Sequence, residues 1–208
     1  MIKIIAKVLE NSKALEEKVI GYRRKIHRTP ELKYEEHNTA ELVIKVLENL
    51  GITVKRNVGK IKDIKNEFKA MGEEPSEDIA PTGIVGELHG TKGAGKTVAL
   101  RADMDALPLS ESEDPNHIPN KEGFRSKRPG IMHACGHDAH VAMLLGAAEV
   151  LSQMKDEFKG TIKLIFQPAE EGGNGAKVMR KAGVLEDVDA IFGIHVWAEL
   201  ESGKVKIN

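Results

Sequence analysis

The sequence predicts an α/β sandwich, because segments with helical spacing of apolar residues alternate with short, continuous apolar runs typical of buried strands. The chain has 208 residues, 40% of them hydrophobic, and a formal net charge of −1. These values are typical of a globular protein that buries one sizeable core. The near balance of charges provides no overall basic field, so we expect no nucleic-acid partner.

The first third of the chain predicts two helices and a strand. Apolar residues recur at helical spacing over 12–27 and again over 37–50, where Gly51 marks the helix end. Residues 52–54 follow as a short strand. The charged segment 60–78 predicts a surface helix and a loop rather than a part of the core.

The middle of the chain predicts two strands and a long loop. Residues 82–88 and 97–102 are joined by a glycine-rich turn, which indicates a hairpin or neighbouring strands. Residues 111–130 form a polar segment with three prolines. Loops of this length inside a compact domain usually act as lids or binding loops.

The last third of the chain returns to regular structure. Residues 139–154 are rich in Ala, Leu and Met at helical spacing and predict a helix. The apolar runs 161–166 and 190–196 predict buried strands. This alternation of helix and strand supports the sandwich, and no internal repeat suggests another architecture.

The sequence also bears on the cellular compartment. Charged residues interrupt the first ten positions too often for a secretory signal, and no apolar run approaches membrane-spanning length. Cys135 is the only cysteine, which excludes an intrachain disulfide and fits a reducing compartment. We therefore expect a cytoplasmic protein without a membrane partner.

Side chains that bind divalent metal ions recur where predicted strands end or helices begin. They are Asp103 and Asp105 after one strand, Cys135 and His137 at the start of a helix, Glu170 and Glu171 after the next strand, and His195 in the last strand. Thiol, imidazole and carboxylate groups are the ligands of borderline divalent ions. Ligands gather at the carboxyl ends of strands in open α/β sheets, so we expect these groups to meet.

Each of these residues also has an ordinary structural interpretation. A lone cysteine is often a small core residue, and adjacent glutamates often form a solvated turn. Their combination, next to glycines that allow close backbone approach, favours a metal site. At the start of its helix, Cys135 is expected to be a thiolate. We expect surface or core roles for the four histidines outside this cluster, which are His27, His37, His89 and His117.

Five segments of the sequence carry a family resemblance. They are RRKIHRTPEL (23–32), LRADMDALP (100–108), MHACGHDAH (132–140), FQPAEE (166–171) and GIHVW (193–197). In this order they resemble the co-catalytic metallopeptidases of the aminoacylase and carboxypeptidase type, in the subfamily of hippurate hydrolases, N-acyl-amino-acid amidohydrolases and auxin-conjugate hydrolases. The resemblance implies a three-layer α/β sandwich of zinc-exopeptidase type, with a mixed, largely parallel sheet.

The resemblance also implies two divalent metal ions per site. Cys, His and Glu ligands suit Zn²⁺ best, and Mn²⁺, Co²⁺ or Ni²⁺ can replace it. The residues that match the family's ligands are Cys135, His137, Glu171 and His195. Glu170 matches the general base, and Asp105 matches an aspartate that orients a ligand. Asp103 stands where other relatives carry a His ligand, so we expect it to support the ligands from outside, as we do for His133 and His140.

The implied function is metal-dependent hydrolysis of amide bonds in N-acyl amino acids or short peptides, by an amidohydrolase, aminoacylase or carboxypeptidase. Its mechanism uses a water activated by two metal ions, with Glu170 as the general base. In an adjacent pair of carboxylates, one can be fixed on the metal while its neighbour faces that water. The sequence leaves the acyl group and the amino acid of the substrate open.

Family members are roughly twice as long as this chain, as expected for a two-domain protein. The resemblance implies that residues 1–208 are the N-terminal part of the metallopeptidase catalytic domain. The lid and dimerisation domain, the C-terminal catalytic part and a late His ligand are then absent from the sequence. We expect exposed sheet edges, which favour a homo-oligomer or a complementing C-terminal half as the partner.

Two alternative functions stay open. The chain can be a truncated, non-catalytic metal-binding fragment, or one half of a split enzyme. It can also be a hydrolase that uses Cys135 as a nucleophile with His137 or His140, although the Glu170–Glu171 pair would then have no role. A thiol nucleophile is blocked by iodoacetamide and survives EDTA, which separates it from a metal-dependent enzyme.

Overall fold

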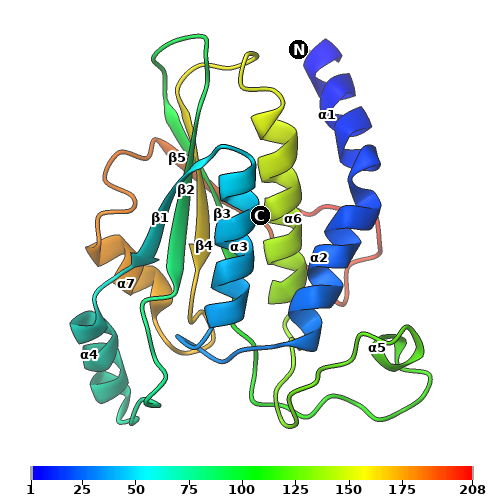
Figure 1. The fold of residues 1–208 in the computed structure, drawn as a ribbon, viewed down its shortest axis with the longest axis vertical. Coiled ribbons are helices and arrows are strands. Elements are labelled where there is room, and N and C mark those ends of the chain that lie inside the picture. Colours follow the sequence, from blue (N-terminus) through cyan, green and yellow to red (C-terminus); the bar gives the residue numbers. More distant parts are fainter. Residues whose placement is uncertain (1, 208) are drawn as a thin grey trace.

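The computed structural model describes residues 2–207 and has the α/β architecture that the sequence predicts (Figure 1). Its helices are α1 (Ile2–Ala14), α2 (Glu16–Arg28), α3 (His37–Asn49), α4 (Ile61–Met71), α5 (Ile118–Lys121), α6 (His137–Ser152) and α7 (Gly175–Lys181). Its strands are β1 (Thr53–Val58), β2 (Gly83–His89), β3 (Thr97–Asp103), β4 (Thr161–Gln167) and β5 (Ala190–Gly193). Among the described residues, no helix is both long and apolar enough to cross a membrane.

The strands form one sheet in the order β1-β2-β4-β3-β5. β3 is parallel to both β4 and β5, whereas β2 is antiparallel to both β1 and β4. Only β2 therefore runs against the other strands, and the sheet is mixed and largely parallel, as predicted. Because β3, β4 and β5 run the same way, their carboxyl ends lie at one edge of the sheet.

The expected pairing of β2 with β3 is wrong, because β4 lies between them. Helix α6 connects β3 to β4 as a parallel crossover, and this places β4 next to β3. The glycine-rich segment after β2 pairs with the chain that enters β4 instead of closing a hairpin. Gly90 N–H donates to the carbonyl oxygen of Gly160 at 2.9 Å, and Thr91 N–H donates to that of Lys155 at 2.7 Å.

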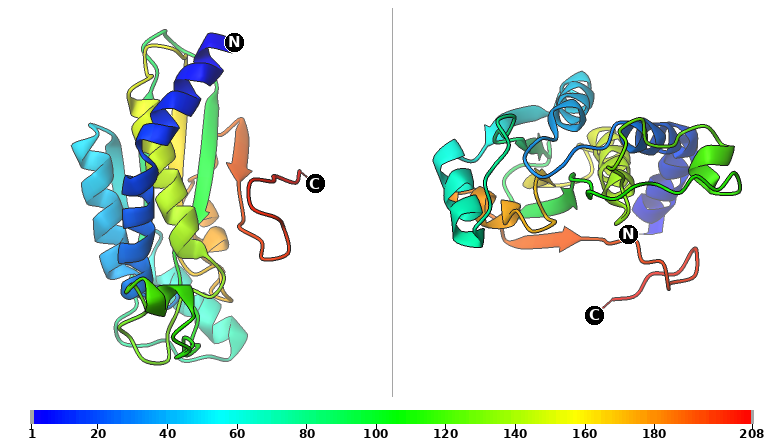
Figure 2. Two further views of the ribbon diagram at one scale, coloured as in Figure 1. Left: turned by 90° about the vertical axis from the view of Figure 1, so that its right-hand side faces the viewer. Right: turned by 90° about the horizontal axis from the view of Figure 1, so that it is seen from below.

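Three layers follow from the burial of both faces of the sheet. Successive residues of β4 point to opposite faces, so Leu164 packs with α3 and α6 in the main core, whereas Ile165 packs with Met179 of α7. Figure 2 shows α1, α2, α3 and α6 on the same side of the sheet. The opposite face is covered by α7 and its flanking loops, which explains why β4 reads as a continuous apolar run.

The N-terminal region differs from the prediction of one helix over 12–27. It forms two helices, α1 and α2, which meet at Leu15. Helix α1 was missed because charged residues interrupt its apolar positions, and its Ile5 and Leu9 are exposed. The short helix α7 was missed as well, since its sequence offers too few residues for a periodic pattern.

Helix α4 is not purely a surface element. Its Ile64 and Phe68 are buried with Tyr34 and Ala169 in a second apolar cluster. Its outer face is charged, which produced the prediction of a surface segment. The buried face gives α4 a structural role, because it packs against the turn that follows β4.

The free edge of β5 exposes apolar side chains. Strand β5 ends at Gly193 rather than continuing to Val196 as expected, and Ile191 and Phe192 are 48% and 60% exposed. Within residues 2–207 no strand pairs with this edge. An unpaired strand with apolar side chains is a ready template for association.

We expect the chain to self-associate through this edge. Sedimentation velocity should show a weight-average mass that rises with concentration, and Phe192→Lys should weaken that association because it places a charge on the edge. Leu109→Lys is the control, since Leu109 is 49% exposed and lies outside the sheet. Equal association of the two variants would show that β5 is not the contact.

Candidate metal centre

The structure brings most of the predicted site residues together at the carboxyl edge of the sheet. Three groups of potential ligand atoms meet there, and each group contains His137. The groups are Cys135 with His137 and His195, Asp103 with His137 and His140, and His137 with Glu170 and Glu171. They come from the ends of β3, β4 and β5 and from the start of α6, which is the placement that the sequence predicts.

His137 is the centre of this arrangement and is fully buried. Its Nδ1 lies 2.8 Å from the carbonyl oxygen of Asp105, so this nitrogen carries a proton, and in the neutral ring Nε2 has a free lone pair. Nε2 has no hydrogen-bond partner among residues 2–207, although it is buried. It faces carboxylate oxygens of Asp103 at 3.7 Å, Glu171 at 3.8 Å and Glu170 at 3.9 Å. A buried ring nitrogen without a hydrogen-bond partner, surrounded by carboxylates, fits a bound cation. The cation would contact both the nitrogen and the carboxylate oxygens.

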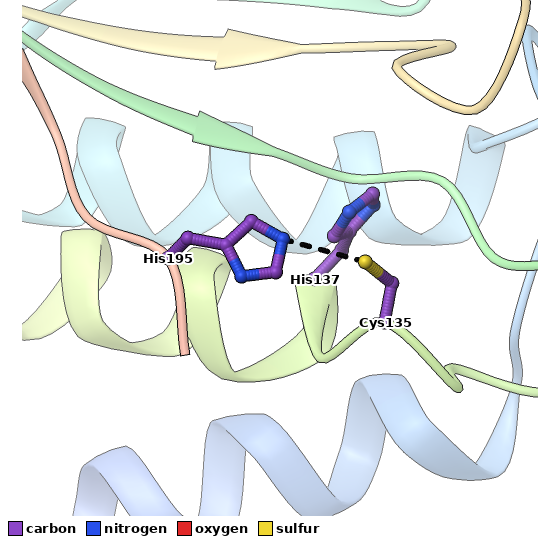
Figure 3. A group of neighbouring side chains, drawn as sticks. All are labelled: Cys135, His137 and His195. Carbon is purple, nitrogen blue, oxygen red and sulfur yellow. Dashed lines mark hydrogen bonds between the residues drawn. The ribbon is translucent and has the colours of Figure 1, made fainter. Parts of the chain in front are cut away.

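Cys135 and His195 form the second part of the site (Figure 3). Their Sγ and Nε2 atoms are 3.3 Å apart, and His195 Nδ1 lies 2.5 Å from the carbonyl oxygen of Val196. Bonds of about 2.3 Å to sulfur and about 2.1 Å to nitrogen at a tetrahedral angle place the two atoms about 3.5 Å apart. The pair therefore fits a shared metal ion.

The surroundings of Cys135 without a metal ion oppose the predicted thiolate. Burial and the neighbouring Glu171 carboxylate raise the pKa of the thiol to about 12, with further contributions from Asp103 and Glu170. The carboxylates outweigh the start of α6, where Gly136 rather than Cys135 is the N-cap residue. These carboxylates disfavour the thiolate that a cysteine-nucleophile hydrolase requires.

Asp105 holds the turn that carries the two glutamates. Its Oδ1 accepts a hydrogen bond from the N–H of Glu170 and its Oδ2 accepts one from the N–H of Glu171, both at 2.9 Å. Asp105 is buried, and its backbone carbonyl also orients His137. Asp105, which follows β3, thus fixes the ring of His137 at the start of α6 and the backbone of the two glutamates after β4.

Asp103 and His140 tie β3 to α6 and to the segment after β5. His140 Nδ1 donates to Asp103 at 2.6 Å, and His140 Nε2 accepts from the N–H of Val196 at 3.0 Å. Both nitrogens of His140 are therefore engaged, and the ring supports the His195 segment. Burial disfavours the charge of Asp103, but the hydrogen bond from His140 and the proximity of His137 and Arg101 outweigh it and lower the pKa of Asp103 to about 2.

His133 lies apart from the three ligand groups of the described chain. Its ring is buried, and neither nitrogen has a hydrogen-bond partner. Burial lowers the pKa of His133 to about 4, so its ring is neutral. It lies 6.3 Å from the ring of His27, centroid to centroid.

Comparison with known proteins agrees with this geometry. Residues 99–208 match the family described as peptidase family M20/M25/M40. The chain belongs to this family.

Two relatives and one solved structure illustrate the similarity of this M20-family chain. It is 46% identical to thermostable carboxypeptidase 2 of Saccharolobus solfataricus over 96% of the chain and 44% of the relative. It is 40% identical to the N-acyl-L-amino acid amidohydrolase of Geobacillus stearothermophilus over 91% of the chain and 44% of the relative. A dinuclear metal-binding M20 peptidase from Bacillus subtilis matches with 37% identity and a TM-score of 0.71 over 90% of the chain and 45% of that structure. The chain thus spans less than half the length of each of these proteins.

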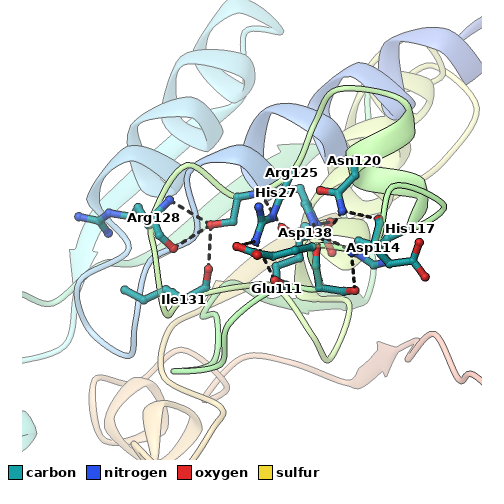
Figure 4. Close-up of polar contacts among 12 residues, drawn as sticks. His27, Glu111, Asp114, His117, Asn120, Arg125, Arg128, Ile131 and Asp138 are labelled. Atoms are coloured by element: carbon teal, nitrogen blue, oxygen red, sulfur yellow. Dashed lines mark hydrogen bonds and ion pairs between the residues drawn. The ribbon is translucent and has the colours of Figure 1, made fainter.

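The M20-family chain has a second buried polar cluster that the sequence analysis did not identify (Figure 4). His27 of α2 lies between two buried carboxylates, with Nδ1 2.8 Å from Asp138 and Nε2 2.9 Å from Glu111. Arg23 also pairs with Asp138, and Glu111 accepts from the N–H of Ser126 at 2.6 Å. The cluster anchors the predicted 111–130 loop to α2 and to the start of α6, which follows Cys135. Arg23, His27 and Asp138 lie in two of the segments that carry the family resemblance, but Glu111 lies outside them, and no local pattern shows that these distant residues meet.

Replacing His27 should destabilise the protein. His27→Gln removes the cation between two buried carboxylates, and we expect the free energy of unfolding to fall by about 3 kcal/mol. Urea denaturation measures this change. His89→Gln is the control, because His89 is exposed and a surface substitution should cost no more than about 0.5 kcal/mol.

The effect of His27→Gln should depend on pH. Burial opposes the charge of His27, but the hydrogen bonds that its ring donates to Asp138 and Glu111 outweigh burial and raise its pKa. The charged and titratable groups around it are Asp138, Glu111 and His133, with Arg23 and His117 paired to the two carboxylates. The stabilisation is fully present below the unfolded pKa of about 6.5 and is lost as the pH rises through the folded pKa. A loss of stability that is the same at pH 6 and pH 9 would contradict this account.

Proposed function

We propose that the chain provides the metal centre of a hydrolase that cleaves amide bonds in N-acyl amino acids or short peptides. The observation that supports this most is the unpaired Nε2 of buried His137, which faces three carboxylates next to the Cys135–His195 pair. The names of the relatives, a carboxypeptidase and an amidohydrolase, agree with this substrate class.

We propose that two divalent ions are held by four residues, with Zn²⁺ as the ion that suits their chemistry best. The residues are Cys135, His137, Glu171 and His195. When bound, the ions supply a Lewis acid for the carbonyl group and lower the pKa of water.

We propose Glu170 as the general base. Its backbone is fixed by Asp105, whereas its side chain is 44% exposed and its Oε2 lies 3.9 Å from Nε2 of His137. This carboxylate can take a proton from water at Oε2 and give it to the amine that leaves. Asp105 holds the backbone of both glutamates, so that Glu171 can serve as the ligand while Glu170 takes the proton.

We also propose that residues 1–208 are the N-terminal part of a catalytic domain. The exposed edge of β5 and the match to less than half of each relative support this proposal. A complementing C-terminal half, or a second copy of the chain, would then cover the edge.

A panel of N-acyl amino acids and dipeptides tests the proposal. The chain is incubated with Zn²⁺, Mn²⁺ or Co²⁺, and the release of free amino acid is measured with and without EDTA. Release that depends on metal supports the hydrolase. Metal binding without release would favour a metal-binding fragment or one half of a split enzyme. Activity that survives EDTA and is lost with iodoacetamide would favour Cys135 as a nucleophile.

A further inference from the structure

The turn after β4 has a backbone conformation that its sequence does not favour. Ala169 is buried and has a φ of +52°, in the left-handed region that residues with a Cβ rarely adopt. The two residues that follow are Glu170 and Glu171. Any relaxation of Ala169 would therefore move both carboxylates of the site.

Two buried carboxylates hold three consecutive N–H groups of this turn. Glu36 Oε1 accepts from the N–H of Ala169 at 2.9 Å, and Asp105 accepts from those of Glu170 and Glu171 at the same distance. We propose that Glu36 is a positioning residue of the metal centre, which fixes Glu170 and Glu171 by anchoring Ala169. This inference rests on the proposed function, because it assigns Glu36 a role in that site.

Capping of helix α3 does not explain the contacts of the Glu36 side chain. Glu36 is the N-cap residue, yet its carboxylate makes no capping hydrogen bond. Glu31 does this instead, because its carboxylate accepts from the N–H groups of Asn38 and Thr39, each at 2.9 Å. The Glu36 side chain instead reaches Ala169 and the hydroxyl group of Thr82.

The electrostatic surroundings of Glu36 also support a positioning role. Burial, followed by the charge of Asp105, raises the pKa of Glu36 to about 8. A buried carboxyl group next to another is unfavourable by itself, and such arrangements persist where they serve a site. A neutral Glu36 can still accept from Ala169 and donate to Thr82. The role therefore requires an acceptor for the N–H of Ala169 rather than a charge.

Three substitutions separate these requirements. Glu36→Gln keeps an acceptor for Ala169 and a donor for Thr82, whereas Glu36→Leu fills similar space and accepts nothing. Glu35→Leu is the matched control, since the adjacent Glu35 carboxylate makes no hydrogen bond or ion pair among the described residues. The readout is Zn²⁺ affinity of the chain in competition with a chromogenic chelator, with circular dichroism to verify the fold.

We expect Glu36→Leu to weaken Zn²⁺ binding by about 10–100-fold, the range for residues that orient metal ligands. Glu36→Gln should stay within about threefold of the unchanged chain, and so should Glu35→Leu. A folded Glu36→Leu variant with undiminished affinity would overturn the inference, and so would a Gln variant as weak as the Leu variant. If Glu36→Leu does not fold, a Gln variant that binds Zn²⁺ more than about tenfold more weakly than the unchanged chain overturns the inference. Failure of the unchanged chain to bind Zn²⁺ would instead overturn the proposed function.

Discussion

Glu170→Gln is expected to lower kcat for N-acyl amino acid hydrolysis by about 10²–10⁴-fold, the contribution of a general base. The amide matches the carboxylate in size and cannot take a proton from water. Because the backbone N–H of residue 170 keeps its bond to Asp105, the turn should stay in place. Metal content and KM should therefore change little.

A matched control distinguishes this effect from a general loss of charge. Glu74→Gln removes a carboxylate from an exposed residue after α4, and hydrolysis should be unaffected. Hydrolysis that persists in Glu170→Gln at the rate of the unchanged chain would remove Glu170 from the mechanism. A variant that also loses its metal would indicate that Glu170 acts as a ligand.

His137→Ala is expected to abolish tight metal binding, with a loss of Zn²⁺ affinity of at least about 100-fold, above the effect of residues that only orient ligands. The reason is geometric, because His137 belongs to each of the three groups of potential ligands. Cys135→Ser should weaken Zn²⁺ binding at the position shared by residues 135 and 195, since a hydroxyl group binds Zn²⁺ far more weakly than a thiolate does. Competition with a chelator measures both changes.

His133→Asn provides the control within the same motif. His133 is buried two residues before Cys135, and it belongs to none of the ligand groups of the described residues. We expect Zn²⁺ affinity within about threefold of the unchanged chain. A loss as large as that of His137→Ala would mean that His133 supports the ligands after all.

The sequence predicts the elements whose pattern is local and long. Helices α3 and α6 and strand β4 have continuous periodic or apolar patterns, and all three form where expected. The pairing of β2 with β4 was not predictable from neighbouring runs, because the α6 crossover decides which strand lies beside β3. Strand order depends on contacts between distant segments, and no local pattern encodes it.

The same distinction holds at the site. Ligand chemistry at segment ends, together with the family resemblance, pointed to Cys135, His137, Glu171 and His195, which belong to two ligand groups that share His137. The supporting contacts were beyond the sequence, since Glu36 reaches a turn 133 residues away. The carboxylates that oppose a Cys135 thiolate were missed for a related reason. The local rule considered the helix start, whereas Glu171 acts from another strand end.

The number of metal ions held per chain, measured by inductively coupled plasma mass spectrometry after Zn²⁺ loading and gel filtration, tests the central claim most directly. We predict that the unchanged chain retains zinc and that His137→Ala, folded by circular dichroism, retains none. Equal zinc in the two proteins, or no zinc in either, would contradict a metal centre built around His137.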